Sequence, residues 1–295
     1  MEKIRIASRH SKLALWQANT VGKMFGREFE IIEMDTRGDD NLEVPISSLG
    51  ANGAFAKEIQ VALLAGKADI AIHSAKDLPS ETPEGLSLVS IPLRGDSRDA
   101  LIGSKLDSLP YAATVATGSA RRRAQLAEIR PDLQFEDLRG NIGTRLEKAS
   151  DFDAIVLAHA ALQRLNKQEF VSEILSVGTM LPQVGQGAIA IECRSDDVAS
   201  IALAKSVNDK DAYRCVMAER AFLSELGGGC SIPCAAYAIP IDSENIWLRT
   251  LLSEPRGRKV IRVEKRGLNI EEMGRSAARE LLDEKGGSEI MDMVV

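Results

Sequence analysis

The sequence lacks the features of a membrane protein or of a disulfide-stabilised secreted protein. It has no apolar run of about 18 residues, so we expect no segment that crosses a membrane. Its N-terminus passes directly into a strand-like alternation and has no apolar signal-peptide core, which predicts a cytoplasmic protein. Four cysteines, at positions 193, 215, 230 and 234, are too few and too scattered for a disulfide framework.

The charge balance also excludes one class of partner. The formal net charge is -6, which argues against general binding to nucleic acid, so any basic site must be local. We therefore expect a small-molecule ligand, with neither a nucleic acid nor a membrane as partner. A length of 295 residues predicts two or three domains.

The first part of the chain alternates strand-like and helix-like segments. Ser11 stands where the first helix would need an N-cap. This alternation is typical of a mainly parallel sheet covered by helices. The expected elements are a strand at 3–8, a helix at 11–25, a strand at 29–38, a helix at 56–66 and a strand at 68–74.

A second part repeats the same order of elements. Residues 35–38, Asp-Thr-Arg-Gly, even correspond to residues 137–140, Asp-Leu-Arg-Gly. The repeat predicts two α/β lobes that face a cleft, although any two α/β domains share such a pattern. The expected elements are a strand at 113–119, a helix at 120–129, a strand at 133–140, a helix at 142–150 and a strand at 152–160.

From about residue 211 the pattern changes to consecutive strands enclosed by helices. This order predicts a small α+β third domain. The turn-rich segment 181–194 is expected to cross back to the first lobe. The expected elements of the third domain are a helix at 212–226, strands at 235–241, 245–252 and 259–267, and a closing helix at 269–286.

Residues 119–145 contain six arginines and no lysine. The arginine fork binds carboxylates and phosphates in a bidentate manner. Three of these arginines occupy the first turn after Ser119, where the helix dipole disfavours cations unless an anion shares the site. We therefore expect a cleft that holds a polyanion. The alternative is a solvated basic face, balanced by Glu128, Asp132, Glu136 and Asp137. The six arginines are Arg121, Arg122, Arg123, Arg130, Arg139 and Arg145.

The first lobe repeats this basic arrangement in a milder form, and it adds a carboxylate. Arg9 and Lys12 flank the Ser11 cap, and the segment 73–79, "HSAKDLP", follows a strand. Asp77 would stabilise a developing positive charge or pass a proton, or it would only cap the turn beside a proline. His73 is expected to be a packed or hydrogen-bonding histidine.

Cys230 lies in the segment "GGGCSIPC", where three glycines leave its thiol open to approach. Zinc requires four ligands, and the Cys230 to Cys234 spacing supplies two with no nearby histidine, so we expect no metal site. The spacing is not that of a thioredoxin-like pair, and no partner histidine can be assigned to a nucleophile. A covalent attachment point fits this thiol better than base-activated catalysis does.

Nine motifs together resemble the porphobilinogen deaminase family. They occur in the family's order over essentially the whole chain: "ASRHSKLALWQA", "TRGD", "HSAKDLP", "RRRAQL", "LRGNIGTRL", "LPQVGQGA", "IECR", "AERAFL" and "GGGCSIP". The resemblance implies two lobes like type II periplasmic binding proteins and a third domain. Residues 1–93 with 186–207 would form lobe 1, residues 94–185 lobe 2, and residues 208–295 the α+β domain that carries the cysteine.

The resemblance also implies an activity and a cofactor. The family condenses four porphobilinogen molecules head to tail, releases ammonia and forms hydroxymethylbilane, the precursor of haem. Cys230 would carry a dipyrromethane cofactor through a thioether, and Asp77 would be the catalytic carboxylate that faces pyrrole N–H groups and a cationic azafulvene. A monomer is expected. The positions that would hold cofactor or substrate acids are Arg9, Ser11, Ser74, Lys76, Thr117, Ser119, Arg121, Arg122, Arg139, Arg145 and Gln186.

The sequence departs from the family pattern in one loop. Residues 47–55 correspond to a mobile lid, in which Phe55 is retained but Ser48 and Asn52 replace the usual lysines. Arg123 is an additional arginine. Two other functions compete with this one: a non-catalytic binding protein that uses the same cleft, and a cysteine-dependent acyl or redox enzyme. The third domain favours catalysis over binding alone, and the absence of a placed base weakens the second alternative.

Overall fold

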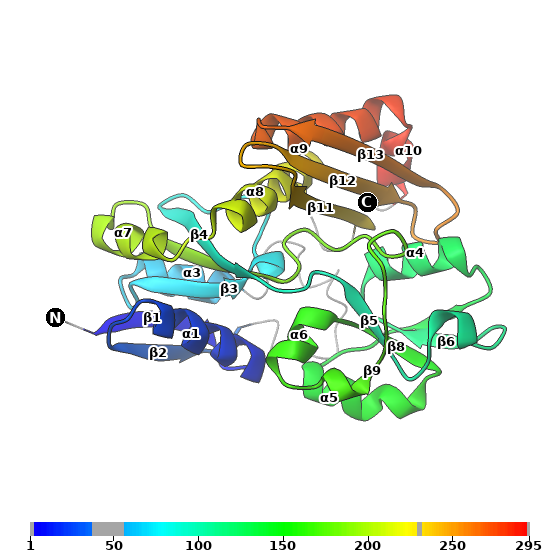
Figure 1. Ribbon diagram of the computed structural model, residues 1–295, viewed down its shortest axis with the longest axis horizontal. Coiled ribbons are helices and arrows are strands. Elements are labelled where there is room, and N and C mark those ends of the chain that lie inside the picture. Colours follow the sequence, from blue (N-terminus) through cyan, green and yellow to red (C-terminus); the bar gives the residue numbers. More distant parts are fainter. Residues whose placement is uncertain (1–2, 37–55, 229–231, 294–295) are drawn as a thin grey trace.

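The computed structural model describes residues 3–36, 56–228 and 232–293. These residues form two α/β lobes that lie side by side, with a smaller domain against both of them (Figure 1). The predicted fold class is therefore confirmed. Several residues singled out from the sequence lie outside the described ranges: Arg37, Ser48, Asn52, Phe55 and Cys230.

Lobe 1 is built on a five-stranded sheet with the order β2-β1-β3-β10-β4. The first three of these strands are parallel, and β10 pairs in the antiparallel direction with both β3 and β4. Apolar residues of α1 and α7 pack on one face of the sheet, and those of α3 on the other. The strands are β1 (Ile4–Arg9), β2 (Phe29–Met34), β3 (Ile70–Ser74), β4 (Leu86–Arg94) and β10 (Ala188–Arg194), and the helices are α1 (Lys12–Met24), α3 (Lys57–Leu64) and α7 (Val198–Ser206).

Lobe 2 repeats this design with the order β7-β6-β8-β5-β9. Here β6, β7 and β8 are parallel, and β5 is antiparallel to both of its neighbours. The equivalent strand orders support the repeat predicted from the sequence. The strands are β5 (Asp99–Ile102), β6 (Thr114–Ala116), β7 (Gln134–Glu136), β8 (Ala154–Ala158) and β9 (Val171–Ile174), and the helices are α4 (Ala120–Ile129), α5 (Ile142–Glu147) and α6 (His159–Arg164).

The chain passes between the lobes twice, before β5 and before β10. The two connections touch where the Gly95 N–H donates to the Gly187 carbonyl oxygen at 2.8 Å. Gly187 has φ +82°, and a Cβ there would lie 2.6 Å from the Gly95 oxygen, so the crossing requires glycine. The predicted return of segment 181–194 to the first lobe is confirmed, because β10 lies within the lobe 1 sheet.

The third domain is an antiparallel sheet, β11-β12-β13, covered on one face by helices. The first of these helices, α8, also packs on lobe 1 through Val216 and Ala212, and it ends shortly before the glycine-rich loop. Its elements are α8 (Lys210–Glu225), β11 (Cys234–Pro240), β12 (Ile246–Ser253), β13 (Val260–Gly267), α9 (Ile270–Arg279), a π-helical turn (Glu280–Glu284) and α10 (Gly287–Asp292).

The sequence analysis missed β4, β5, β9, α6 and α7. It also expected one closing helix at 269–286, whereas α9 passes into a π-helical turn and Gly286 adopts φ +74° before α10 begins. The expected domain limits remain predictions. Of the helices in the described ranges, none is both long enough and apolar enough to cross a bilayer.

Candidate active site

Two serine-capped helices begin directly after parallel strands, one in each lobe. Ser11 accepts a hydrogen bond from the Ala14 N–H at 3.3 Å and caps α1. Ser119 accepts one from the Arg122 N–H at 3.4 Å and caps α4, while Thr117 Oγ1 accepts from the Ser119 N–H at 3.3 Å. Because helices start here at the carboxyl ends of the strands, their N-termini face the region where such sheets bind ligands.

A small pocket of about 40 Å³ opens beside Asp77 in lobe 1. Arg9 Nη1 lies 3.8 Å from Asp77 Oδ2, and the Asp77 side chain is 29% exposed. The pocket also includes Ser11, Ser74 and Gln17, whose Nε2 donates to Ser74 Oγ at 2.9 Å. The structure thus brings four predicted site residues together, and it adds Gln17, which the sequence analysis had left within an amphipathic helix.

Lys76 and Asp77 share a short 3₁₀ turn, Ala75–Asp77, that follows β3. Burial lowers the pKa of the Lys76 ammonium to about 8; Asp77 raises that pKa, whereas Arg122 lowers it. Lys76 Nζ forms no hydrogen bond or ion pair with the described residues. Lys76 is therefore a cation that the fold places at the site without a close protein partner.

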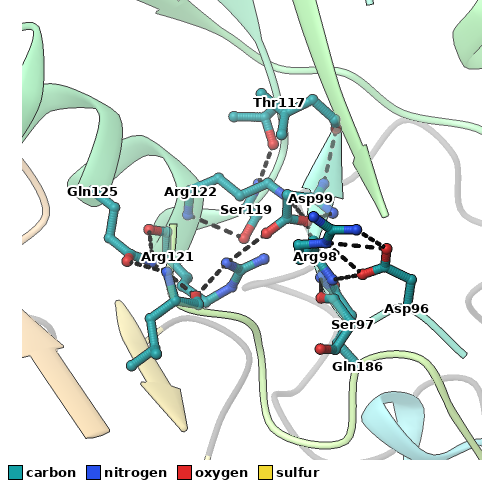
Figure 2. Close-up of polar contacts among 12 residues, drawn as sticks. Asp96, Ser97, Arg98, Asp99, Thr117, Ser119, Arg121, Arg122, Gln125 and Gln186 are labelled. Atoms are coloured by element: carbon teal, nitrogen blue, oxygen red, sulfur yellow. Dashed lines mark hydrogen bonds and ion pairs between the residues drawn. The ribbon is translucent and has the colours of Figure 1, made fainter. Parts of the chain in front are cut away.

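Asp99, at the start of β5, is a fully buried carboxylate between the arginines of α4 (Figure 2). Its Oδ1 accepts from Arg122 Nη2 at 2.8 Å and Nε at 3.0 Å, and from Gln186 Nε2 at 3.0 Å. Its Oδ2 lies 2.8 Å from Arg121 Nη1. That contact lacks the geometry of a hydrogen bond and is an ion pair, because opposite charges attract at this distance whatever the angle. Burial acts to raise the pKa of Asp99, but Arg121 and Arg122 hold it far below its ordinary value.

Asp99 corrects the interpretation of the arginine-rich helix. The cations in the first turn of α4 do require an anion, but the protein itself supplies one to Arg121 and Arg122. Both are buried, at 4% and 6% exposure, so the alternative of a solvated basic face is wrong for them. That alternative holds for Arg123 and Arg130, which pair with Asp137 at 2.6 Å and Asp132 at 2.7 Å.

Arg121 nevertheless keeps unused hydrogen-bonding capacity. Its Nη1 donates to the Leu181 carbonyl oxygen at 2.7 Å, whereas its Nε and Nη2 are buried and have no hydrogen-bond partner among the described residues. A buried donor without a partner costs about 1–3 kcal/mol. Gln186 Oε1 is a buried acceptor in the same condition. These buried atoms therefore have hydrogen-bonding capacity that no described residue uses.

Arg139 and Arg145 extend the positive charge toward lobe 1. Arg145 Nε donates to the Gly140 carbonyl oxygen at 2.7 Å, and burial lowers the pKa of Arg145 to about 10. Arg122 and Arg139 lower that pKa as well, whereas Asp77 raises it, which brings lobe 2 cations within electrostatic range of the lobe 1 carboxylate. We call the following six residues the cationic cluster: Arg9, Lys76, Arg121, Arg122, Arg139 and Arg145.

Among the described residues, Asp77 and Asp99 are the only carboxylates that interact with Lys76, Arg121, Arg122 and Arg145, four members of the cationic cluster. An excess of positive charge at the ends of the strands attracts and holds anions. The fold and the site therefore define a two-lobed α/β protein with a positively charged site at the ends of its strands and a third domain beside the lobes.

The chain belongs to the porphobilinogen deaminase family. Residues 4–202 match the family model described as "Porphobilinogen deaminase, dipyromethane cofactor binding domain", and residues 213–283 match "Porphobilinogen deaminase, C-terminal domain". Membership assigns hydroxymethylbilane synthesis: four porphobilinogen molecules are condensed head to tail, with release of ammonia, by an enzyme that uses a dipyrromethane cofactor. This assignment decides against both competing functions, the non-catalytic binder and the cysteine-dependent acyl or redox enzyme.

Solved structures with a similar fold include several binding proteins. YhfZ from Shigella flexneri is 19% identical, with a TM-score of 0.38 over 75% of this chain and 94% of that one. A periplasmic binding protein from Salmonella typhimurium with high arginine specificity is 13% identical, with a TM-score of 0.40 over 70% and 92%. A TRAP periplasmic solute binding protein from Pseudomonas putida F1, with bound D-glucuronate, is 10% identical, with a TM-score of 0.39 over 71% and 78%. At these scores the functional assignment does not rest on them.

Proposed function

We propose that the cationic cluster binds the acetate and propionate groups of the dipyrromethane cofactor and of the growing chain, and that Asp77 is the catalytic carboxylate. The observation that carries this proposal is the charge balance of four cations from two lobes, Lys76, Arg121, Arg122 and Arg145, for which the described residues supply only the carboxylates of Asp77 and Asp99. The donor set suits the cofactor, since the unpartnered N–H groups of Arg121 and the unpaired Lys76 ammonium bind carboxylates. When bound, the cofactor supplies the pyrrole carbon to which porphobilinogen is joined.

The protein residues would divide the work in this way. Arg121, Arg122 and Arg145 orient carboxylate groups on the lobe 2 side, and Arg9 and Lys76 do so on the lobe 1 side. Serine and threonine hydroxyls at the helix caps, and the Gln186 amide, complete the polar wall. This holds porphobilinogen with its aminomethyl carbon toward the chain end, an arrangement that converts part of the binding energy into orientation.

Asp77 would act on the charge that develops in the reaction. When the C–N bond of the protonated aminomethyl group of porphobilinogen breaks, ammonia leaves with the electron pair, and the positive charge passes to the methylene carbon and its pyrrole. A fixed carboxylate beside that pyrrole accepts its N–H hydrogen bond and stabilises the positive charge. Arg9, 3.8 Å away, orients the carboxylate without a tight ion pair that would use up its charge.

We also propose Cys230 as the thioether attachment point. The other three cysteines, Cys193, Cys215 and Cys234, are buried. Burial raises the pKa of Cys193 and of Cys215 to about 12, so neither thiol ionises readily near neutral pH. Cys230 follows α8, after Gly227 and Gly228 with φ +85° and +64°, and the backbone freedom of these glycines suits a segment that carries a cofactor.

The proposal is tested by replacing Asp77 in protein whose covalent adduct has been verified by mass. Asp77→Asn keeps the shape and the turn-capping ability but removes the charge, so bilane formation from porphobilinogen should fall by about 10²–10³. Asp77→Glu retains the charge and should retain more activity than Asn. If the Asn variant turns over at the wild-type rate, Asp77 only caps the turn.

The finer points on location and assembly are part of the same proposal. The enzyme would act in the cytoplasm as a monomer, and the free thiols of Cys193 and Cys215 suit a reducing compartment. Light scattering during gel filtration of the adduct-bearing protein should give the mass of one chain, 31.9 kDa plus the cofactor. A mass of two chains would contradict it.

A further inference from the structure

A buried contact between a histidine and a glutamate joins β3, the strand that leads to Asp77, to its neighbour β10. His73, on β3, and Glu192, on β10, face each other with His73 Nε2 3.0 Å from Glu192 Oε2. Their side chains are 3% and 1% exposed. Gln60, from α3, donates its amide to both oxygens of Glu192, at 3.1 and 3.0 Å. Burial acts to raise the pKa of Glu192, but His73 and Gln60 lower it below the ordinary value, so Glu192 is a buried anion.

A buried cation from the third domain completes this group. Arg220, on α8, is 5% exposed and donates through Nη2 to the Ser80 carbonyl oxygen at 3.1 Å. Arg220 and Glu192 lie within electrostatic range, since Glu192 raises the pKa of Arg220 and Arg220 lowers that of Glu192. The negative charge of Glu192 in lobe 1 therefore interacts with the positive charge of Arg220 on α8, the helix that precedes the glycine-rich loop.

The contacts of Glu192 with His73 and of Arg220 with Ser80 lie at the two ends of segment 74–79. His73 directly precedes residues 74–79, which contain Lys76 and Asp77, and Ser80 directly follows them. The anion at Glu192 holds the side chain before the segment, and the cation at Arg220 holds the backbone after it. Asp77 stands near the middle, so a shift at either end moves its carboxylate.

We infer that Glu192 and Arg220 are positioning residues for the reaction, which clamp the ends of segment 74–79 and so fix the Asp77 carboxylate relative to porphobilinogen. The inference rests on the proposed role of Asp77. Because Arg220 is on α8, this clamp, formed by Glu192 and Arg220, also aligns the turn Ala75–Asp77 with the third domain. Stability alone is a weak reason for such a group, because buried ion pairs are often no more stabilising than apolar residues of the same volume.

The test compares Glu192→Gln with Asp69→Asn, both in protein whose adduct has been confirmed by mass. Asp69 pairs with Arg5 at 2.6 Å just before the other end of β3, away from the site, and it provides the control for a lost ion pair in the same lobe. Because displacements of about 1 Å cost up to about 10²-fold, Glu192→Gln should lower kcat by about 10- to 100-fold. KM for porphobilinogen should stay within about twofold, and Asp69→Asn should leave both constants unchanged.

A double variant separates positioning from stability. Arg220→Met and Glu192→Gln each remove one of two opposite buried charges that lie within electrostatic range and should lower Tm, whereas the double variant removes both charges and should recover part of that loss. The clamp predicts that kcat of the double variant stays as low as that of the single variants. Recovery of kcat together with Tm, or a Glu192→Gln variant with wild-type kcat, would overturn the inference.

The Asp77 variants keep this test independent of the proposed function. If Asp77→Asn is inactive and Glu192→Gln is fully active, the clamp is wrong and the catalytic assignment stands. If Asp77→Asn is fully active, the catalytic assignment fails whatever Glu192 does, and the clamp fails with it.

Discussion

Replacement of Asp99 by asparagine would remove the charge that Arg121 and Arg122 share inside lobe 2. The variant keeps the shape of the side chain, but its amide oxygen can replace only one of the two carboxylate oxygens, so its NH2 group must face a guanidinium donor. Breaking a fully buried ion pair in this way costs about 3–5 kcal/mol, because the remaining charges stay buried without a partner. The carbonyl oxygens of Leu181 and Val156, which accept from these arginines at 2.7 and 2.9 Å, offset part of the loss. We therefore expect Asp99→Asn to lower the free energy of unfolding by about 3 kcal/mol.

Urea unfolding of the cofactor-free protein measures this loss. Asp137→Asn is the matched control, since Asp137 pairs with Arg123 of the same helix but is 63% exposed, and an exposed pair contributes less than about 1 kcal/mol. The pKa of Asp99 is lowered on folding from 3.8, so its contribution is present above that pH and is lost as the pH falls through the folded-state pKa. The difference in the free energy of unfolding between the wild type and Asp99→Asn should therefore decrease below about pH 4. Equal losses for the two variants would refute the reasoning.

Two further predictions concern the cationic cluster. Arg121→Lys should keep an ion pair with Asp99 but lose the unpartnered N–H donors, so the fold should persist. Bilane formation should fall by about 10- to 100-fold, as expected for the loss of about 1.5–3 kcal/mol of binding free energy. Arg123→Lys is the control, and equal activities of the two variants would contradict the role of Arg121. Lys76→Met should raise the stability of the cofactor-free protein by about 1–2 kcal/mol at neutral pH, because burial lowers the pKa of Lys76 to about 8 and disfavours its charged form. Between about pH 8 and 10.5 the unfolded state binds more protons than the folded state, so the stability of the wild type should increase as the pH rises through that range. The stability advantage of Lys76→Met should decrease over the same range, which thermal unfolding at several pH values measures.

The local elements of the site were predictable because short-range rules determine them. Ser11 and Ser119 cap helices whose periodicity is visible in the sequence, and the helix predicted at 120–129 has those same limits in the structure. The conflict between three arginines and the helix dipole correctly indicated that an anion must lie nearby. These inferences need only residues within one or two turns of each other.

The identity of that anion could not be predicted in the same way. Asp99 lies more than 20 residues before Arg121, in a four-residue strand with no periodicity of its own, and it reaches the helix only because the chain crosses between the lobes. Glu192 and Arg220 likewise meet His73 and Ser80 through sheet pairing and helix packing between distant segments. Alternating buried strands show which residues are apolar, but not which strand lies beside which.

The central claim is that this enzyme builds its own dipyrromethane primer and holds it on Cys230. Intact-protein mass spectrometry tests it most directly. The purified wild type should exceed the mass of its sequence by about two porphobilinogen units less ammonia, Cys230→Ser should lack that increment, and Cys234→Ala should keep it. A fully active wild type with the unmodified mass of its sequence, or a Cys230→Ser variant that still carries the increment, would contradict the account.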